Sequence, residues 1–141
     1  MTVAATLSAL PHTLPSCSNA RIALFAIRRI GACGLTDARA AHALFTAFGE
    51  GFRRPLTLAR ALMADMAASS TVPIAIAPCC CVRMTASEHM LLTILARVEY
   101  APDCALLLMQ DLLGYRVVDG VLASAAALAG AFADEGRPIS A

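Results

Sequence analysis

The chain has 141 residues, enough for one hydrophobic core that needs no disulfide or structural metal. Hydrophobic residues make up 59% and charged residues only 15%, so polar groups are too few to cover the surface, and we expect apolar surface to be buried against a second copy. A net charge of +1 gives no field that attracts DNA or RNA, so we expect no nucleic-acid partner.

No segment is predicted to span a membrane. The longest uncharged interior stretch, 66–82, contains Pro73 and Pro78, and the next, 120–133, is shorter than a bilayer requires. Residues 1–20 lack the basic start of a secretory signal. We therefore expect a cytoplasmic protein whose cysteines stay reduced.

Residues 1–18 are expected to form an N-terminal tail, because two prolines interrupt them and they show no sustained periodicity. Asn19 is predicted to cap a first helix over 20–32, which Gly34 ends. Thr36 is predicted to cap a second helix, whose apolar residues recur at helical spacing up to Phe48.

A third helix is predicted from Pro55, a residue favoured at the first helical position, to about Ala68. The segment 72–82 contains two prolines and alternating apolar residues, which predicts a short extended segment buried against helices or paired across a dimer. Thr85 and Glu88 have the spacing of a capping box, so a fourth helix begins there.

The helix predicted over 104–113 is apolar on almost every side, which indicates a central helix or an interface. Asp119 is predicted to cap a last helix over 120–134, and residues 137–141 are expected to form a C-terminal tail. The sequence therefore predicts an all-α, single-domain bundle of about six helices over 19–136.

The run Cys79-Cys80-Cys81 is the most conspicuous chemical feature of the sequence. It lies just before a predicted helix start, and Arg83 follows it; both features favour a thiolate. If the backbone is extended there, Cys79 and Cys81 face one side and Cys80 the other.

Four interpretations of this run stay open. The thiols can be small buried hydrophobes, reactive redox groups, metal ligands, or an adjacent disulfide, which would be a strained ring. For a metal, Cys79 and Cys81 with His89 could bind zinc or another soft ion, but a structural zinc site needs four ligands. The remaining cysteines are single and scattered: Cys17, Cys33 and Cys104.

Arg53 and Arg54 precede Pro55 at a predicted helix start, where the helix dipole disfavours cations. A bound anion would reconcile charge and dipole, since helix starts bind phosphate and carboxylate. The alternative is that both are solvated or pair with Glu50 or Asp65. Motifs typical of metalloproteases, P-loops and serine hydrolases are absent from the sequence.

Three stretches resemble a known family: Asn19 to Phe25, Phe52 to Leu56, and Ala77 to Cys81 followed by Arg83-Met84-Thr85 and Glu88. They resemble uncharacterised proteins of sphingomonad-type alphaproteobacteria, and the similarity would run from about His12 to Gly114. That family has no assigned activity, cofactor or catalytic residue. The resemblance therefore implies a cytoplasmic bacterial protein and no functional residue.

The leading hypothesis from the sequence is a non-enzymatic helical protein that acts through self-association, most simply as a homodimer, or through partner binding. The alternative is a thiol protein that binds a metal or senses redox state through Cys79 and Cys81. A third hypothesis is an enzyme that binds a small anionic substrate at Arg53 and Arg54.

Overall fold

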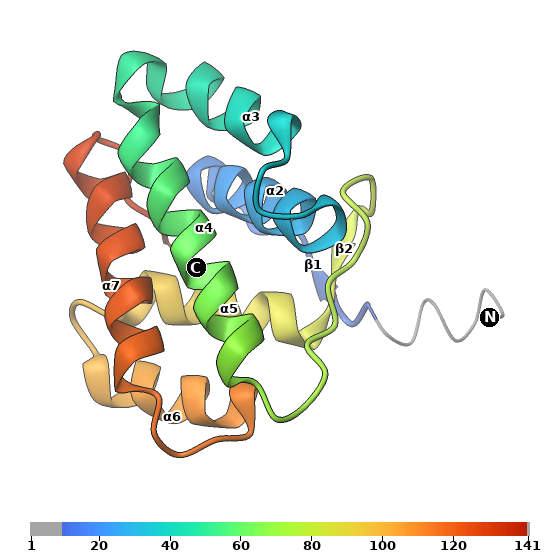
Figure 1. Cartoon of the computed structure of the whole chain (residues 1–141), viewed down its shortest axis with the longest axis vertical. Helices are drawn as coiled ribbons and strands as arrows, with labels where there is room; N and C mark the ends of the chain where they lie inside the picture. The colour runs from blue at the N-terminus through green and yellow to red at the C-terminus, as the bar shows by residue number, and fades with distance from the viewer. Residues whose placement is uncertain (1–9, 141) are drawn as a thin grey trace, which may run out of the picture.

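The chain folds into α-helices joined by short connections, with a single pair of very short strands among the described residues (Figure 1). The computed structural model describes residues 10–140. This architecture confirms the predicted all-α class. In chain order the elements are β1 (His12–Thr13), α2 (Ser18–Cys33), α3 (Ala38–Phe48), the 3-10 helix η1 (Gly49–Phe52), α4 (Arg53–Ser69), β2 (Arg83–Met84), α5 (Ala86–Arg97), α6 (Pro102–Leu113) and α7 (Asp119–Asp134).

Helices α4 and α7 lie side by side and run in opposite directions along the molecule (Figure 1). Helices α2 and α5 lie behind α4 in this view, α3 packs on α2, and α6 packs on α5. Every α-helix contributes at least one fully buried large side chain, so the helices share one core. Representative members, one from each helix, are Ile27, Leu44, Leu62, Leu91, Met109 and Phe132.

Five of the predicted helix starts are wrong by one or two residues. Helices α4, α6 and α7 begin at Arg53, Pro102 and Asp119 rather than at 55, 104 and 120. Helix α2 begins at Ser18, and the Asn19 side chain donates instead to the carbonyl of Pro138 at 2.9 Å. Helix α3 is capped by Asp37 rather than Thr36, because the Asp37 carboxylate accepts from the amide of Ala40 at 2.9 Å. The capping box of Thr85 and Glu88 is confirmed at the start of α5.

Helix α6 is only partly central. It buries Ala105, Met109, Leu112 and Leu113, whereas the Leu107 side chain is 66% exposed. An apolar side chain of this size in water is a candidate contact for a partner. Within residues 10–140, no helix combines the length and the apolar character needed to cross a membrane.

The segment 72–82 has no regular secondary structure, as its two prolines predict. Ile74 and Ile76 are half-buried and pack against the core, while Val72 and Val82 are 43% and 77% exposed. The segment therefore lies across the helices with only part of its apolar side chains covered.

Both ends of the described chain pack on the helices. Strand β1 pairs antiparallel with β2, with His12 opposite Met84 and Thr13 opposite Arg83. Near the C-terminus, Ile139 is 8% exposed and belongs to the core. Of the two expected tails, residues 1–9 and 141 lie outside the described residues.

A buried ion pair joins α2 to α5. Arg28 Nε lies 2.7 Å from Glu88 Oε2, and the two side chains are 3% and 0% exposed. Burying two charges costs several kcal/mol per ion, on the order of the whole stability of a domain, unless the charges are paired and their hydrogen bonds are satisfied. The pair therefore fixes how α2 and α5 meet.

We expect Glu88→Gln to destabilise the protein by about 3–5 kcal/mol, because it leaves the Arg28 guanidinium buried without a counter-charge. Equilibrium unfolding in urea at neutral pH measures the loss. The matched control is Asp134→Asn, which breaks the ion pair to Arg54 whose side chains are 60% and 62% exposed. The control should lie within about 0.5 kcal/mol of the parent, and equal losses for both variants would contradict the prediction.

Candidate functional site

The cysteine run is a β-turn rather than an extended strand. The amide of Cys81 donates to the carbonyl of Pro78 at 3.1 Å, which closes the turn over Cys79 and Cys80. Cys79 and Cys81 are half-buried and line the same cavity, whereas Cys80 is exposed and is not part of its wall. The two thiols thus face the same cavity, as the sequence predicted. The reason is different: a turn places them there, and not the alternation of side chains along a strand.

The cavity that Cys79 and Cys81 line, called here the thiol cavity, has a volume of about 120 Å³. The opposite wall is the N-terminal half of α2, and Leu14 from the segment before α2 contributes a further side chain. The wall is apolar except for two guanidinium groups and the two thiols. Its full lining is Leu14, Arg21, Leu24, Phe25, Arg28, Cys79 and Cys81.

The buried ion pair holds the backbone around the thiol cavity. Arg28 Nη1 donates to the carbonyl of Cys81 at 2.8 Å, and Nη2 donates to the carbonyl of Arg83 at 2.6 Å. The Glu88 carboxylate accepts from the amide of Thr85 at 2.9 Å and from the amide of Ala77 at 3.3 Å. The residues on both sides of the cysteine turn are therefore fixed to one rigid centre.

A second arginine lies beside the Cys79 thiol. Arg29 Nη1 is 3.9 Å from Cys79 Sγ, within reach of a hydrogen bond to sulfur. Arg29 is itself held by a two-pronged pair to Asp37, at 3.1 and 2.9 Å. The contact therefore places a fixed positive charge next to the Cys79 sulfur.

The same interactions set the charge state of Asp37. The hydrogen bond from Arg29 holds the pKa of the Asp37 carboxyl below its usual value, and the amide of Ala40 lowers it further. Conversely, the hydrogen bond to Asp37 raises the pKa of the Arg29 guanidinium. Both members of the pair are therefore charged at neutral pH.

Cys17 is a chemically distinct thiol that the sequence analysis missed. Burial raises its pKa, but hydrogen bonds from the Ser140 side chain and from the backbone amides of Ala20, Ser140 and Asn19 outweigh it, so the net pKa is lowered. Cys17 is the residue before α2, where helix amides point at it. The two-residue error in the predicted helix start concealed this position.

His89 is not placed near Cys79 and Cys81 in a metal-binding group. Its ring stacks on that of His12, with centroids 4.0 Å apart and planes inclined by 13°. It lines a different cavity, of about 240 Å³. Across residues 10–140, no three His, Cys, Asp or Glu side chains are grouped to hold a metal ion.

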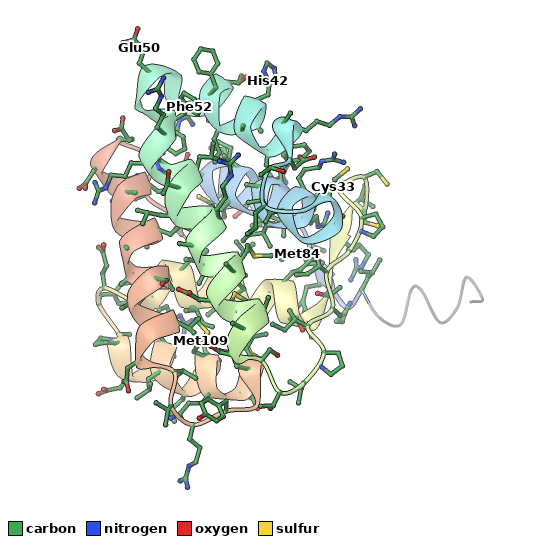
Figure 2. The ribbon with its side chains drawn as sticks, viewed as in Figure 1. Cys33, His42, Glu50, Phe52, Met84 and Met109 are labelled. Atoms are coloured by element: carbon green, nitrogen blue, oxygen red, sulfur yellow. The ribbon has the colours of Figure 1, made fainter. Side chains whose placement is uncertain are left out.

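Arg53 and Arg54 do not lie at an open helix end. Phe52 and Arg53 both have helical backbone angles, so η1 runs directly into α4 without the free amides that bind anions. Arg54 Nη1 pairs with Asp134 Oδ2 at 2.6 Å on the surface. Of the partners predicted for it, Glu50 points away from the bundle (Figure 2), and Asp65 accepts from the Ser124 hydroxyl.

Comparison with known proteins gives one match. The model of a protein family, described as a family of unknown function (DUF6628), matches residues 1–111. No curated protein and no solved structure matches the chain. The matched range includes every residue that lines the thiol cavity and both members of the buried ion pair.

We expect the stabilising effect of Asp37 to depend on pH. Because its pKa is lowered on folding, its contribution is complete above the ordinary aspartate pKa of about 3.9 and is lost as the pH falls through the lower, folded-state value. The stability difference between the parent and Asp37→Asn, measured by urea unfolding, should therefore be large at about pH 7 and vanish in strong acid.

The matched control for this measurement is Asp111→Asn, since Asp111 is exposed on α6. This variant should follow the parent at every pH. A stability difference for Asp37→Asn that stays constant into strong acid would show that ionisation of Asp37 does not stabilise the fold.

Proposed function

The chain belongs to this family of unknown function, and we infer its role from its own residues. We propose that it is a thiol-based redox sensor that uses Cys79 and Cys81. The observation that carries the proposal is the thiol cavity. It brings two thiols together on one side, beside arginine side chains, in a protein with few charges.

Arg29 supports a distinct role for Cys79. Its guanidinium contacts the Cys79 sulfur at 3.9 Å and is fixed by Asp37. Of the two thiols that line the cavity, Cys79 is the one with a recorded hydrogen-bond contact to an arginine side chain, so we expect it to react before Cys81. Cys81, one residue beyond Cys80 in the same turn, is placed to complete the reaction.

The chemistry requires an oxidant, for which we propose a small hydroperoxide. The Cys79 sulfur attacks the terminal peroxide oxygen, which gives a sulfenic acid and releases an alcohol, or water from hydrogen peroxide. The Cys81 sulfur then attacks the Cys79 sulfur, a disulfide forms and a second water leaves. In total, two thiols and one hydroperoxide yield one disulfide, one alcohol and one water.

The buried ion pair gives this reaction a structural consequence. The carbonyl of Cys81 accepts from Arg28, and Arg28 pairs with Glu88. A disulfide that changes the turn therefore acts directly on the contact between α2 and α5. Through this contact, a local chemical event such as disulfide formation can change the packing of two helices and thereby a larger surface.

Burial argues against a purely structural role for the thiols. The buried core of residues 10–140 contains no cysteine, although free cysteine is among the most frequently buried residues. All six cysteines are free, and each is half-buried or exposed. Free, accessible thiols fit a reducing compartment, so we propose a cytoplasmic protein.

A second candidate function, self-association as a homodimer, is favoured by exposed apolar side chains at one end of the bundle. Hydrogen bonds from Thr71 to the carbonyls of Leu113 and Gly114 bring residues 71–72 to the end of α6. Figure 1 shows the end of α4 close to α6 at the bottom of the bundle, and we call the surface there the apolar end. Its members are Val72, Leu107, Tyr115 and Val117, which are 43%, 66%, 48% and 67% exposed.

We further propose that the protein comes from an alphaproteobacterium, has no nucleic-acid partner, and forms one domain that includes the predicted range 19–136. The all-arginine basic composition and the low net charge support the first two proposals. The pairing of β1 with β2 and the burial of Ile139 extend the packed unit beyond 19–136 at both ends.

For the redox function, we expect one oxidation by hydroperoxide to consume two thiols per chain. Cys79→Ser should slow this oxidation by roughly tenfold or more, since it removes the reactive thiolate. Cys81→Ser should leave a sulfenic acid that a dimedone probe traps. Mass spectrometry of the labelled peptide is the measurement.

Two exposed cysteines supply controls for this experiment. Cys80→Ser and Cys33→Ser change exposed thiols that do not line the thiol cavity, and both should react like the parent. If all six thiols react only after unfolding, or if the Cys80 control is as slow as Cys79→Ser, the sensor proposal is wrong.

For the association function, we expect a concentration-dependent dimer in sedimentation velocity at micromolar protein. Val117→Glu should shift the equilibrium to monomer, because it places a charge in the apolar end. The control is Val82→Glu, which is 77% exposed next to β2. A parent protein that remains monomeric over the whole concentration range would contradict the association proposal.

A further inference from the structure

The segment of residues 10–16, called here the strap, is tied down across one side of the thiol cavity. Arg83 donates from Nε to the carbonyl of Leu10 and from Nη2 to the carbonyl of Pro11, both at 2.8 Å. At the other end, Arg21 Nε donates to the carbonyl of Pro15 at 2.5 Å. Between these ties, Leu14 forms part of the cavity wall.

The regular pairing that holds the strap is small. Strands β1 and β2 have two residues each, so the ladder by itself gives little stability. Besides the arginine hydrogen bonds, a contact between rings joins the strap to α5: His12 stacks on His89 at 4.0 Å. The stack is therefore the titratable one among the contacts that hold the strap.

The surroundings of the stack favour neutral rings. The cavity beside His89 is lined by uncharged residues of the strap, Met84, Leu92 and Ser140. The charged groups nearest in the chain are Arg83, a cation that contacts the strap, and Glu88, whose carboxylate is turned to Arg28. On the C-terminal side, Ser140 faces the thiol of Cys17.

The titration of His89 agrees with this arrangement. Partial removal of the ring from water lowers the pKa of His89, and the charge of His12 lowers it further. The closed strap thus binds protons more weakly than an open one. As the pH falls below the ordinary histidine value of about 6.5, protons are taken up preferentially by the open form.

We propose that the strap is a pH-sensitive cover of the thiol cavity: at neutral pH the stacked histidines hold it over Cys79 and Cys81, and protonation of the stack releases it. Release removes Leu14 from the cavity wall and admits the oxidant. The proposal rests on the redox function for its biological meaning, because it describes how access to those two thiols is controlled. The movement of the strap itself is a separate, measurable property.

The first experiment measures the strap directly by hydrogen exchange of the full-length protein. Exchange of peptides covering residues 10–16 is compared at about pH 7.5 and about pH 5.5, after correction for the intrinsic pH dependence. We expect protection to fall severalfold at the lower pH, because protons are taken up preferentially by the open form. Protection of α7 should not change, which excludes global unfolding.

Two variants test whether the histidines cause the change. His89→Phe and His12→Phe each keep an aromatic ring for stacking but remove one titrating group. Strap protection in both variants should be much less dependent on pH than in the parent. If either variant fails to fold, the other supplies the same test, since each replaces one ring of the stack.

The second experiment measures access to the thiols. A variant that keeps only Cys79 and Cys81 is compared with one that keeps only the exposed Cys80. The reagent is 2,2′-dithiodipyridine, which reacts with thiols in acid, and the ratio of the two rates removes the pH dependence of the reagent itself. We expect this ratio to rise severalfold between about pH 7.5 and about pH 5.5, and to stay flat with His89→Phe.

The two experiments separate this proposal from the redox function. If strap protection is equal at both pH values, the cover is wrong even when Cys79 and Cys81 react with hydroperoxide. If protection falls in acid while the rate ratio stays constant, the strap moves but does not control the thiols, which also overturns the proposal. If hydroperoxide never oxidises the two thiols but both the protection and the ratio respond, the redox function fails while the cover stands.

Discussion

The ion pair between Arg28 and Glu88 is the interaction on which the cysteine turn and the junction of α2 with α5 depend. Each side chain takes part in four hydrogen bonds: two within the pair, two from Arg28 to the carbonyls of Cys81 and Arg83, and two from the amides of Ala77 and Thr85 to Glu88. This saturation offsets the cost of removing both charges from water.

The local concentration of arginine is unusual because the chain has so few charges. Arg21 and Arg28 line the thiol cavity, Arg29 contacts the Cys79 sulfur, and Arg83 ties the strap. Most of these guanidinium groups donate to backbone carbonyls in loops. Those carbonyls have no partner in a helix or a sheet. Arginine is suited to this task since its planar group presents several fixed donors and stays charged. One set of cations therefore organises the loops and surrounds the thiol cavity.

The sequence predicted the helical elements well and their ends less well. Apolar spacing located the helices, and the Thr85–Glu88 capping box was confirmed, because both depend on residues close together in the chain. The starts of α2 and α3 were misplaced because Asn19 and Asp37 are used differently: Asn19 binds Pro138, and Asp37 caps α3 while it pairs with Arg29. Which of two neighbouring polar residues caps a helix depends on partners that are distant in the chain. The spacing of residues in the sequence does not reveal those partners.

By itself, the sequence determined the fold class, the irregular segment at 72–82 and the position of the cysteine run before a capped helix, because propensity, proline and capping act within a few residues. Only the tertiary structure decided which side chains meet. It joined Arg28 to Glu88 across 60 positions of sequence, separated His89 from the cysteines and stacked it on His12. Such contacts arise from how helices pack, and the packing depends on the whole core rather than on any local pattern.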